Sequence, residues 1–201
     1  GVRVELPAMI WKEFEDRIYE PKIIYKTSKY EDYTRMFCHN SRGHVVTENT
    51  NGIITTNGHA YKDESLKTNN SNFAVLSSIN FTEPFNKPIE YVSSIAKLSN
   101  IIGGGNVLVQ RFGDLTRGRR TTESRLAKST TIPTLKASPG DLSLVLPKRI
   151  LDNIIQTLYA LDKVAPGTAN DDTLLYGVEA KYYSCRPKMN ADFEIIPNVY
   201  C

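Results

Sequence analysis

The chain has 201 residues, of which 40% are hydrophobic and 23% charged, and its formal net charge is +3 at pH 7. This length suits one domain or two small ones, and the composition is ordinary for a globular protein. The weak net charge argues against a dedicated nucleic-acid-binding protein, because such proteins usually carry a strongly basic face.

The first part of the chain is predicted to form mainly short strands. Residues 2–6 alternate between apolar and polar side chains, which predicts a strand. Apolar residues at helical spacing over residues 10–18 predict a short helix that ends near Tyr19. Turn residues at 40–43 and at Asn51-Gly52 would connect three later strands into an antiparallel meander. These and the other early strands are predicted at residues 22–27, 34–38, 44–48, 53–56 and 73–79.

The second part of the chain contains two long predicted helices. Pro88 begins the first, over residues 88–102, and Gly103 is expected to be its C-cap. Pro147 begins the second, which extends to Lys163 and has a continuous apolar face. Strands and helices do not alternate as βαβ units, so the sequence predicts an α+β fold with a mainly antiparallel sheet and three or four packed helices. The remaining predictions are strands at residues 107–110, 173–184 and 193–200, and irregular structure over 121–143.

The cysteines and the apolar runs bear on the cellular compartment. Cys38, Cys185 and Cys201 are widely spaced and form neither a CxxC pair nor a zinc-binding pattern. Reduced thiols in a cytoplasmic protein are therefore expected. The sequence shows no basic-then-apolar leader, and no apolar run approaches the roughly 18 residues of a membrane-spanning helix. No membrane partner is expected.

The segment most indicative of function is residues 103–120, which begins with three glycines and ends in a basic cluster. Glycine lets the backbone approach a ligand closely, and the guanidinium group of arginine matches carboxylate and phosphate geometry. The segment is therefore a candidate anion site, and the alternative is a solvated basic loop after a strand. Its four candidate contact residues are Arg111, Arg117, Arg119 and Arg120.

Asp114 lies inside this segment and is expected to pair with a neighbouring arginine rather than to act as a base. Replacement of Arg117 or Arg119 by alanine is expected to leave stability nearly unchanged, because exposed charges contribute little.

Weaker candidates lie in the polar turns of the first part. Arg42, Asn57 and His59 are candidate polar contacts to a substrate or cofactor. Cys38 and His39 would face opposite sides of a strand, so they do not form a nucleophile–base pair. A core cysteine and surface histidines are expected there, because a metal site would need a third ligand and no recognised spacing supplies one.

No complete cofactor or catalytic fingerprint is present, but many short strings together resemble one family. These strings resemble the FAD-dependent dehydrogenases, also described as NAD(FAD)-utilising dehydrogenases, over nearly all 201 residues. They include Val-Gln-Arg-Phe-Gly-Asp at 109–114, Arg-Gly-Arg-Arg at 117–120, Asn-Ser-Arg-Gly at 40–43 and Pro-Gly-Asp-Leu at 139–142. The others lie at residues 1–5, 20–22, 35–38, 44–49, 57–59, 72–74, 81–84, 133–136, 160–162 and 174–177.

The resemblance implies the inserted, substrate-side domain of a two-domain flavoprotein. Both FAD fingerprints of the family are absent from these residues, and both ends of the chain read as strands, so a piece of a longer protein is expected. FAD would be held by the rest of that protein, with NAD(P)H as a candidate electron donor, and this chain alone is expected to be inactive. Its expected partners are its own FAD-binding domain and a small-molecule substrate. The four arginines would orient an anionic group of the substrate, or of the cofactor across the domain interface.

The alternative is a binding module without redox chemistry, in which residues 111–120 contact an anionic partner such as RNA. Base-stacking aromatic residues beside the arginines would favour RNA, and only Phe112 is present there. A nucleic-acid partner is therefore not expected. Neither the substrate nor a catalytic base follows from the residues.

Overall fold

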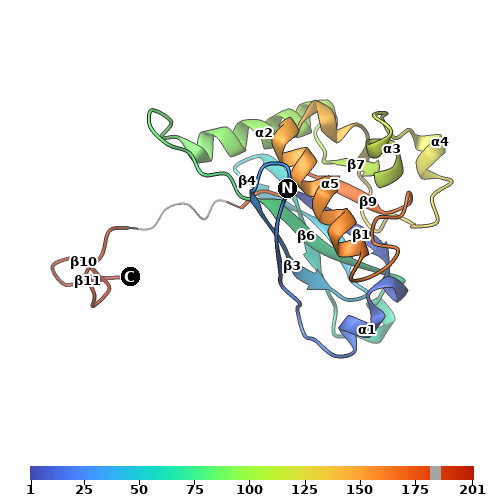
Figure 1. Cartoon of the computed structure of the whole chain (residues 1–201), viewed down its shortest axis with the longest axis horizontal. Helices are drawn as coiled ribbons and strands as arrows, with labels where there is room; N and C mark the ends of the chain where they lie inside the picture. Colours follow the sequence, from blue (N-terminus) through green and yellow to red (C-terminus); the bar gives the residue numbers. More distant parts are fainter. Residues whose placement is uncertain (182–186) are drawn as a thin grey trace.

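The computed structural model describes residues 1–181 and 187–201. Its centre is a seven-stranded sheet with the strand order β2-β3-β6-β1-β9-β7-β8 (Figure 1). Neighbouring strands are antiparallel except for the parallel pair β7 and β8, so the predicted α+β fold with a mainly antiparallel sheet is confirmed. The strands are β1 (Val2–Pro7), β2 (Ile23–Lys26), β3 (Tyr33–Asn40), β6 (Asn70–Ser77), β7 (Leu108–Arg111), β8 (Ser138–Pro139) and β9 (Leu174–Gly177).

Two further hairpins lie outside this sheet. One joins β4 (His44–Thr50) to β5 (Ile53–His59), and the other joins β10 (Glu194–Ile196) to β11 (Val199–Tyr200). The predicted hairpin between β4 and β5 is confirmed, but the predicted pairing of β3 with β4 is wrong. Thr68 N donates to Arg42 O, so the turn after β3 is fixed beside the approach to β6, and β3 pairs with β2 and β6 instead.

The observed helices match the predicted ones where the helical spacing of apolar residues continues over several turns. The two long predicted helices are confirmed, whereas the first predicted helix stops well before Tyr19, and residues 121–143 contain short regular elements. Residues 182–184 of the predicted strand 173–184, and Cys185, lie outside the described residues. The helices are α1 (Lys12–Glu15), α2 (Pro88–Ile102), α3 (Phe112–Thr116), α4 (Glu123–Leu126) and α5 (Lys148–Asp162), with 3-10 turns η1 (Ala8–Ile10), η2 (Glu64–Leu66) and η3 (Leu142–Leu144).

One face of the sheet packs against α5, which crosses the strands in Figure 1. The apolar face of α5 contributes Ile150, Ile154 and Leu158 to a core shared with Phe73 of β6 and Leu175 of β9. Burial of each large side chain contributes roughly 1.5–3 kcal/mol before conformational entropy is subtracted. The predicted packing of the second long helix against the strands at 73–79 and 174–183 is thus confirmed over its described part.

The opposite face of the sheet is of mixed character, because it carries buried polar side chains as well as a second, smaller apolar cluster that includes Tyr176. Since side chains alternate along a strand, β1 directs Arg3 and Glu5 to this face, and both are fully buried. Arg3 donates to Asn57 of the hairpin of β4 and β5, whereas Glu5 accepts hydrogen bonds from Thr134. Tyr176 Oη donates to Glu5, whose pKa is raised by burial against the opposing effect of its hydrogen bonds. No helix among the described residues combines the length and the apolar character needed to cross a bilayer.

Candidate functional site

The arginine-rich segment folds around one buried aspartate. Asp114 lies in α3, and its carboxylate accepts hydrogen bonds from Thr121 Oγ1 and Arg119 Nε, each at 2.8 Å. Arg111 Nη1 lies 3.5 Å from Asp114 Oδ2. Burial raises the pKa of Asp114, but the hydrogen bonds from Thr121 and Arg119 outweigh it, so this pKa lies below its ordinary value. The predicted pairing of Asp114 with a neighbouring arginine is confirmed.

Two aspartates that precede β9 form ion pairs with Arg111 and Arg117. Arg111 forms a second ion pair with Asp172, and Arg117 Nη2 lies 2.7 Å from Asp171 Oδ2. Gly113 permits this approach, because a Cβ atom at that position would lie 2.5 Å from Asp171 Cγ. The chain separates these aspartates from the arginines by more than fifty residues, so local sequence patterns gave no signal for the pairing.

Arg120 differs from the other three arginines, because its side chain is exposed and forms no ion pair with the residues that the structure describes. The segment is also partly helical, as α3, and is not the continuous loop that the sequence predicted. Its basic charge is thus largely neutralised by aspartates, and a contact with an external anion stays a prediction.

The two exposed arginines that pair with aspartates, Arg117 and Arg119, should respond differently to mutation. The Arg117→Ala variant is expected to lose no more than about 0.5 kcal/mol, because Arg117 and Asp171 are both half exposed. For Arg119 the structure revises the expectation of a nearly unchanged stability. The Arg119→Ala variant is expected to lose about 1–2 kcal/mol, because it removes a charged donor from the buried Asp114. Urea unfolding measures both values.

The pH dependence provides a check on the Arg119 result. A carboxyl group with a lowered pKa stabilises the fold above its ordinary pKa of about 3.9, and this stabilisation is lost as the pH falls through the lowered value. The difference in the free energy of unfolding between Arg119→Ala and the wild type should therefore become smaller at acidic pH. Equal losses in the two alanine variants at neutral pH would contradict the role assigned to Asp114.

The weaker candidates lie on or beside the hairpin of β4 and β5 and make local contacts. Asn57 Oδ1 accepts a hydrogen bond from Arg3 Nη2 at 3.0 Å, Arg42 Nε donates to Thr68 O, and the His59 ring packs edge-on against Tyr61. Among the described residues none of these three side chains contacts the arginine segment. No group of three or more potential metal ligands occurs in residues 1–181 and 187–201.

The predicted surface position of His39 is wrong. A bulge at Cys38, whose φ is 51°, shifts the register of β3 and turns the ring of His39 inward. The ring stacks on Phe73 with the centroids 6.0 Å apart, and Nε2 lies 3.4 Å from Glu15 Oε1. Burial lowers the pKa of His39, and the nearby Glu15 partly opposes this. Cys38 itself is half buried.

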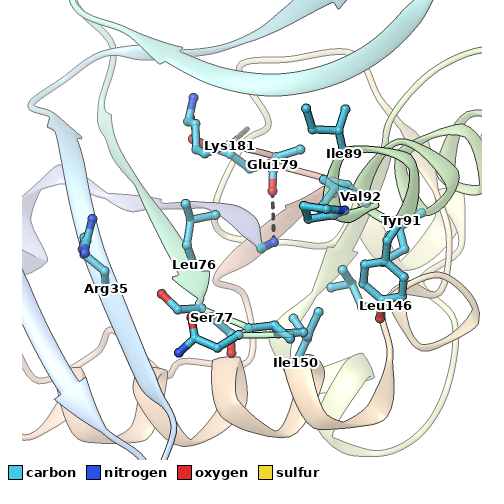
Figure 2. Close-up of a pocket in the computed structure, with 18 of the residues that line it drawn as sticks. Arg35, Leu76, Ser77, Ile89, Tyr91, Val92, Leu146, Ile150, Glu179 and Lys181 are labelled. Carbon is cyan, nitrogen blue, oxygen red and sulfur yellow. Dashed lines mark hydrogen bonds and ion pairs between the residues drawn. The ribbon is translucent and has the colours of Figure 1, made fainter. Parts of the chain in front are cut away.

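A pocket of about 420 Å³ lies at the end of β6, between α2 and the start of α5 (Figure 2). Figure 2 shows Leu76 and Ile150 on two of its walls, with Val92 and Tyr91 projecting from α2. The ring of Phe81 stands edge-on to Tyr91 at 5.2 Å between centroids. The pocket is therefore mostly apolar with aromatic groups at one side, as small-molecule sites usually are.

Basic groups outnumber carboxylates beside this pocket. The exposed Arg35 of β3 lines it and forms no ion pair with any described residue. Lys181 Nζ lies 3.6 Å from Glu179 Oε1, but Arg3 Nη2 already holds the same oxygen at 2.7 Å. Two cationic side chains, Arg3 and Lys181, thus share one buried carboxylate. With Arg35 added, the pocket has an excess of positive charge.

The sequence matches the family described as "FAD-dependent protein, C-terminal domain-like" over residues 1–182. The chain belongs to this family. It is accordingly a domain of a flavoprotein, and the part of the predicted resemblance that concerns FAD dependence is confirmed. No curated protein matches the sequence.

The described residues of this family member do not form a complete FAD site. A pyrophosphate group is usually bound by a glycine-rich turn at the start of a helix. Here Gly103–Gly105 follows the end of α2 and leads into β7, and the first amides of α3 are occupied, since Phe112 N donates to Thr173 O and Gly113 N to Asp171 O. Neither turn therefore offers the free backbone amides that a pyrophosphate group needs.

Sequence reasoning missed the pocket altogether. Arg35 lies in a strand whose alternation marks it as solvent-facing, and the other walls come from β6, α2, α5 and residues 178–181. These segments are far apart in the chain, and only the fold brings them together.

Proposed function

We propose that this chain is the substrate-side domain of an FAD-dependent oxidoreductase, and that its substrate binds in the pocket between β6, α2 and α5. Membership of the FAD-dependent family carries the proposal. The pocket supports it, because its volume lies within the range of roughly 300–1,000 Å³ that is usual for ligand sites and its walls are mostly apolar. The flavin would accept the electrons of the substrate, and this domain would bind and orient that substrate.

Two segments that are distant in the chain meet beside the pocket. Gly1 and Glu179 exchange two backbone hydrogen bonds, with Glu179 N donating to Gly1 O at 2.9 Å and Gly1 N donating to Glu179 O at 3.0 Å. Both residues line the pocket. A flavin held beside this end of the pocket would lie close to a substrate bound within it, as the proposed transfer of electrons requires.

The arginine segment has a smaller part in this proposal. Arg120 and the half-exposed Arg117 are the members whose guanidinium groups remain accessible for an anion across a domain interface. No contact among the described residues favours the alternative of RNA binding.

The experiment compares the full-length protein with the 201-residue chain. The full-length protein is expected to retain flavin absorbance through gel filtration, whereas the shorter chain is expected to remain colourless after incubation with FAD. Anaerobic addition of NAD(P)H or of candidate organic substrates should then bleach the flavin absorbance of the full-length protein. A full-length protein that takes up no FAD on reconstitution, or whose flavin no donor reduces, would refute the proposal.

A further inference from the structure

The pocket at the end of β6 combines an apolar interior with basic groups at its margin. Its inner walls include Val92, Leu146 and Ile150, which can surround a hydrocarbon or ring system but cannot pair with a charge. Arg35, in contrast, lines the pocket with a guanidinium group that no carboxylate within the described residues neutralises. A ligand that uses both features must have an apolar body and an anionic group.

The surrounding charges favour the same ligand. Arg3, Glu179 and Lys181 form a cluster of two cations and one carboxylate at one end of the pocket. The carboxylate of Glu179 is fully buried and accepts two hydrogen bonds from Arg3. Its pairing with Arg3 leaves the charge of Lys181 as an excess at this end of the pocket. The starts of α2 and α5 also border the pocket, and the positive ends of the two helix dipoles add to the same potential.

The remaining polar groups at the pocket are neutral. Ser78 and Asn80 line it on the exposed segment after β6, and no side-chain hydrogen bond of either residue occurs within the described part of the chain. Phe81 and Tyr91 lie near them and offer ring faces or edges to a flat ligand. Hydrogen-bonding groups beside aromatic rings suit a substrate that carries its polar group at one end of a ring system.

We infer that the pocket binds a small aromatic or alicyclic carboxylic acid, with Arg35 contacting the carboxylate and the ring system between α2 and α5. Arg35 is then a specificity-determining residue that selects the anionic ligand over its neutral analogue. The inference rests on the proposed function for the role of this acid as a substrate, but binding itself requires no flavin.

The test is a titration of the 201-residue chain with 2-naphthoate, followed by the fluorescence of the ligand, and a parallel titration with the neutral 2-naphthamide. The wild type is expected to bind the acid at least about tenfold more tightly than the amide, as expected for one charge-assisted contact. Arg35→Gln should remove this preference and leave the affinity for the amide unchanged, whereas Arg35→Lys should retain part of it. Salt should weaken the preference, because Arg35 is exposed.

Two further variants control for charge and for the pocket itself. Lys128→Gln removes one positive charge at an exposed position outside the pocket and should leave both affinities unchanged. Val92→Trp should weaken both ligands, because it fills the space between α2 and α5. Equal binding of acid and amide by the wild type, an unchanged preference in Arg35→Gln, or the absence of saturable binding would each overturn the inference.

The outcome separates this inference from the proposed function. Because Gly1 itself lines the pocket, the titration is repeated on the full-length protein, and loss of the acid preference there would also overturn the inference. If the full-length protein prefers the acid but holds no flavin, the inferred ligand site stands and the proposed oxidoreductase function is refuted. If the full-length protein holds a reducible flavin but shows no preference for the acid, the proposed oxidoreductase function stands and the inferred ligand class is refuted.

Discussion

Replacing Arg3 by methionine is expected to lower the free energy of unfolding by about 3–5 kcal/mol, because the fully buried carboxylate of Glu179 loses both hydrogen bonds from Arg3 and keeps only the longer ion pair with Lys181. Arg3 also donates hydrogen bonds to Cys38 O, Asn57 Oδ1 and Asn72 Oδ1, and these acceptors lose a donor in the same variant. Urea unfolding measures the loss, with the fluorescence of the single, buried tryptophan as the signal.

The double variant Arg3→Met with Glu179→Leu provides the matched comparison. Removal of both charges eliminates the buried carboxylate that has lost its arginine partner, so part of the lost stability should return. The recovery is expected to be incomplete because the three acceptors of Arg3 remain without their donor. Arg17→Met, at an exposed position, should be nearly neutral. A double variant no more stable than Arg3→Met would contradict the assigned role of the ion pair.

The loss in Arg3→Met should also depend on pH. Burial raises the pKa of Glu179 even in the wild type, where Arg3 opposes this effect. A carboxyl group whose folded-state pKa is raised stabilises the fold below its unfolded-state pKa, and this contribution is lost as the pH rises through the folded-state value. Without Arg3 the pKa rises further, so the variant should lose more stability at about pH 8 than at about pH 5. A loss independent of pH would indicate that packing rather than charge is responsible.

These buried charges show where sequence analysis of the fold reached its limit. The alternation of residues 2–6 correctly predicted a strand, but alternation normally places charged side chains in solvent. Both side chains are instead buried by segments that are distant in the chain, since Arg3 contacts Asn57 of β5 and Glu5 contacts Thr134. The period of the pattern therefore identified the strand, and only the tertiary structure identified which charges are buried.

The candidate site shows the same division. The pairing of Asp114 with an arginine five residues away was predictable, because neighbours in the chain remain neighbours in the fold. The ion pair of Arg117 with Asp171, and the pocket that Arg35 lines together with residues of α2 and α5, depend on contacts between distant segments, for which one sequence gives no signal. The resemblance to FAD-dependent proteins identified the family, whereas the ligand class required the pocket.

The Leu158→Ala variant is the second large effect that we expect, with a loss of about 2–5 kcal/mol in the free energy of unfolding. Leu158 is fully buried on the inner face of α5, within the same core cluster as Phe73 of β6 and Leu175 of β9. The close packing of this region leaves little room to collapse, so alanine would create a cavity as well as lose apolar contacts.

Leu144→Ala makes the same chemical change at a position that is 62% exposed, and it should change the stability by no more than about 0.5 kcal/mol. Thermal and urea unfolding of the two variants, without added FAD, compare them directly. Because the core elements named above all belong to this chain, the wild type should unfold cooperatively without the cofactor, and Leu158→Ala should unfold at a clearly lower temperature. Equal losses in the two leucine variants would show that α5 does not form the centre of an independent core. The folded state would then depend on contacts outside the 201 residues.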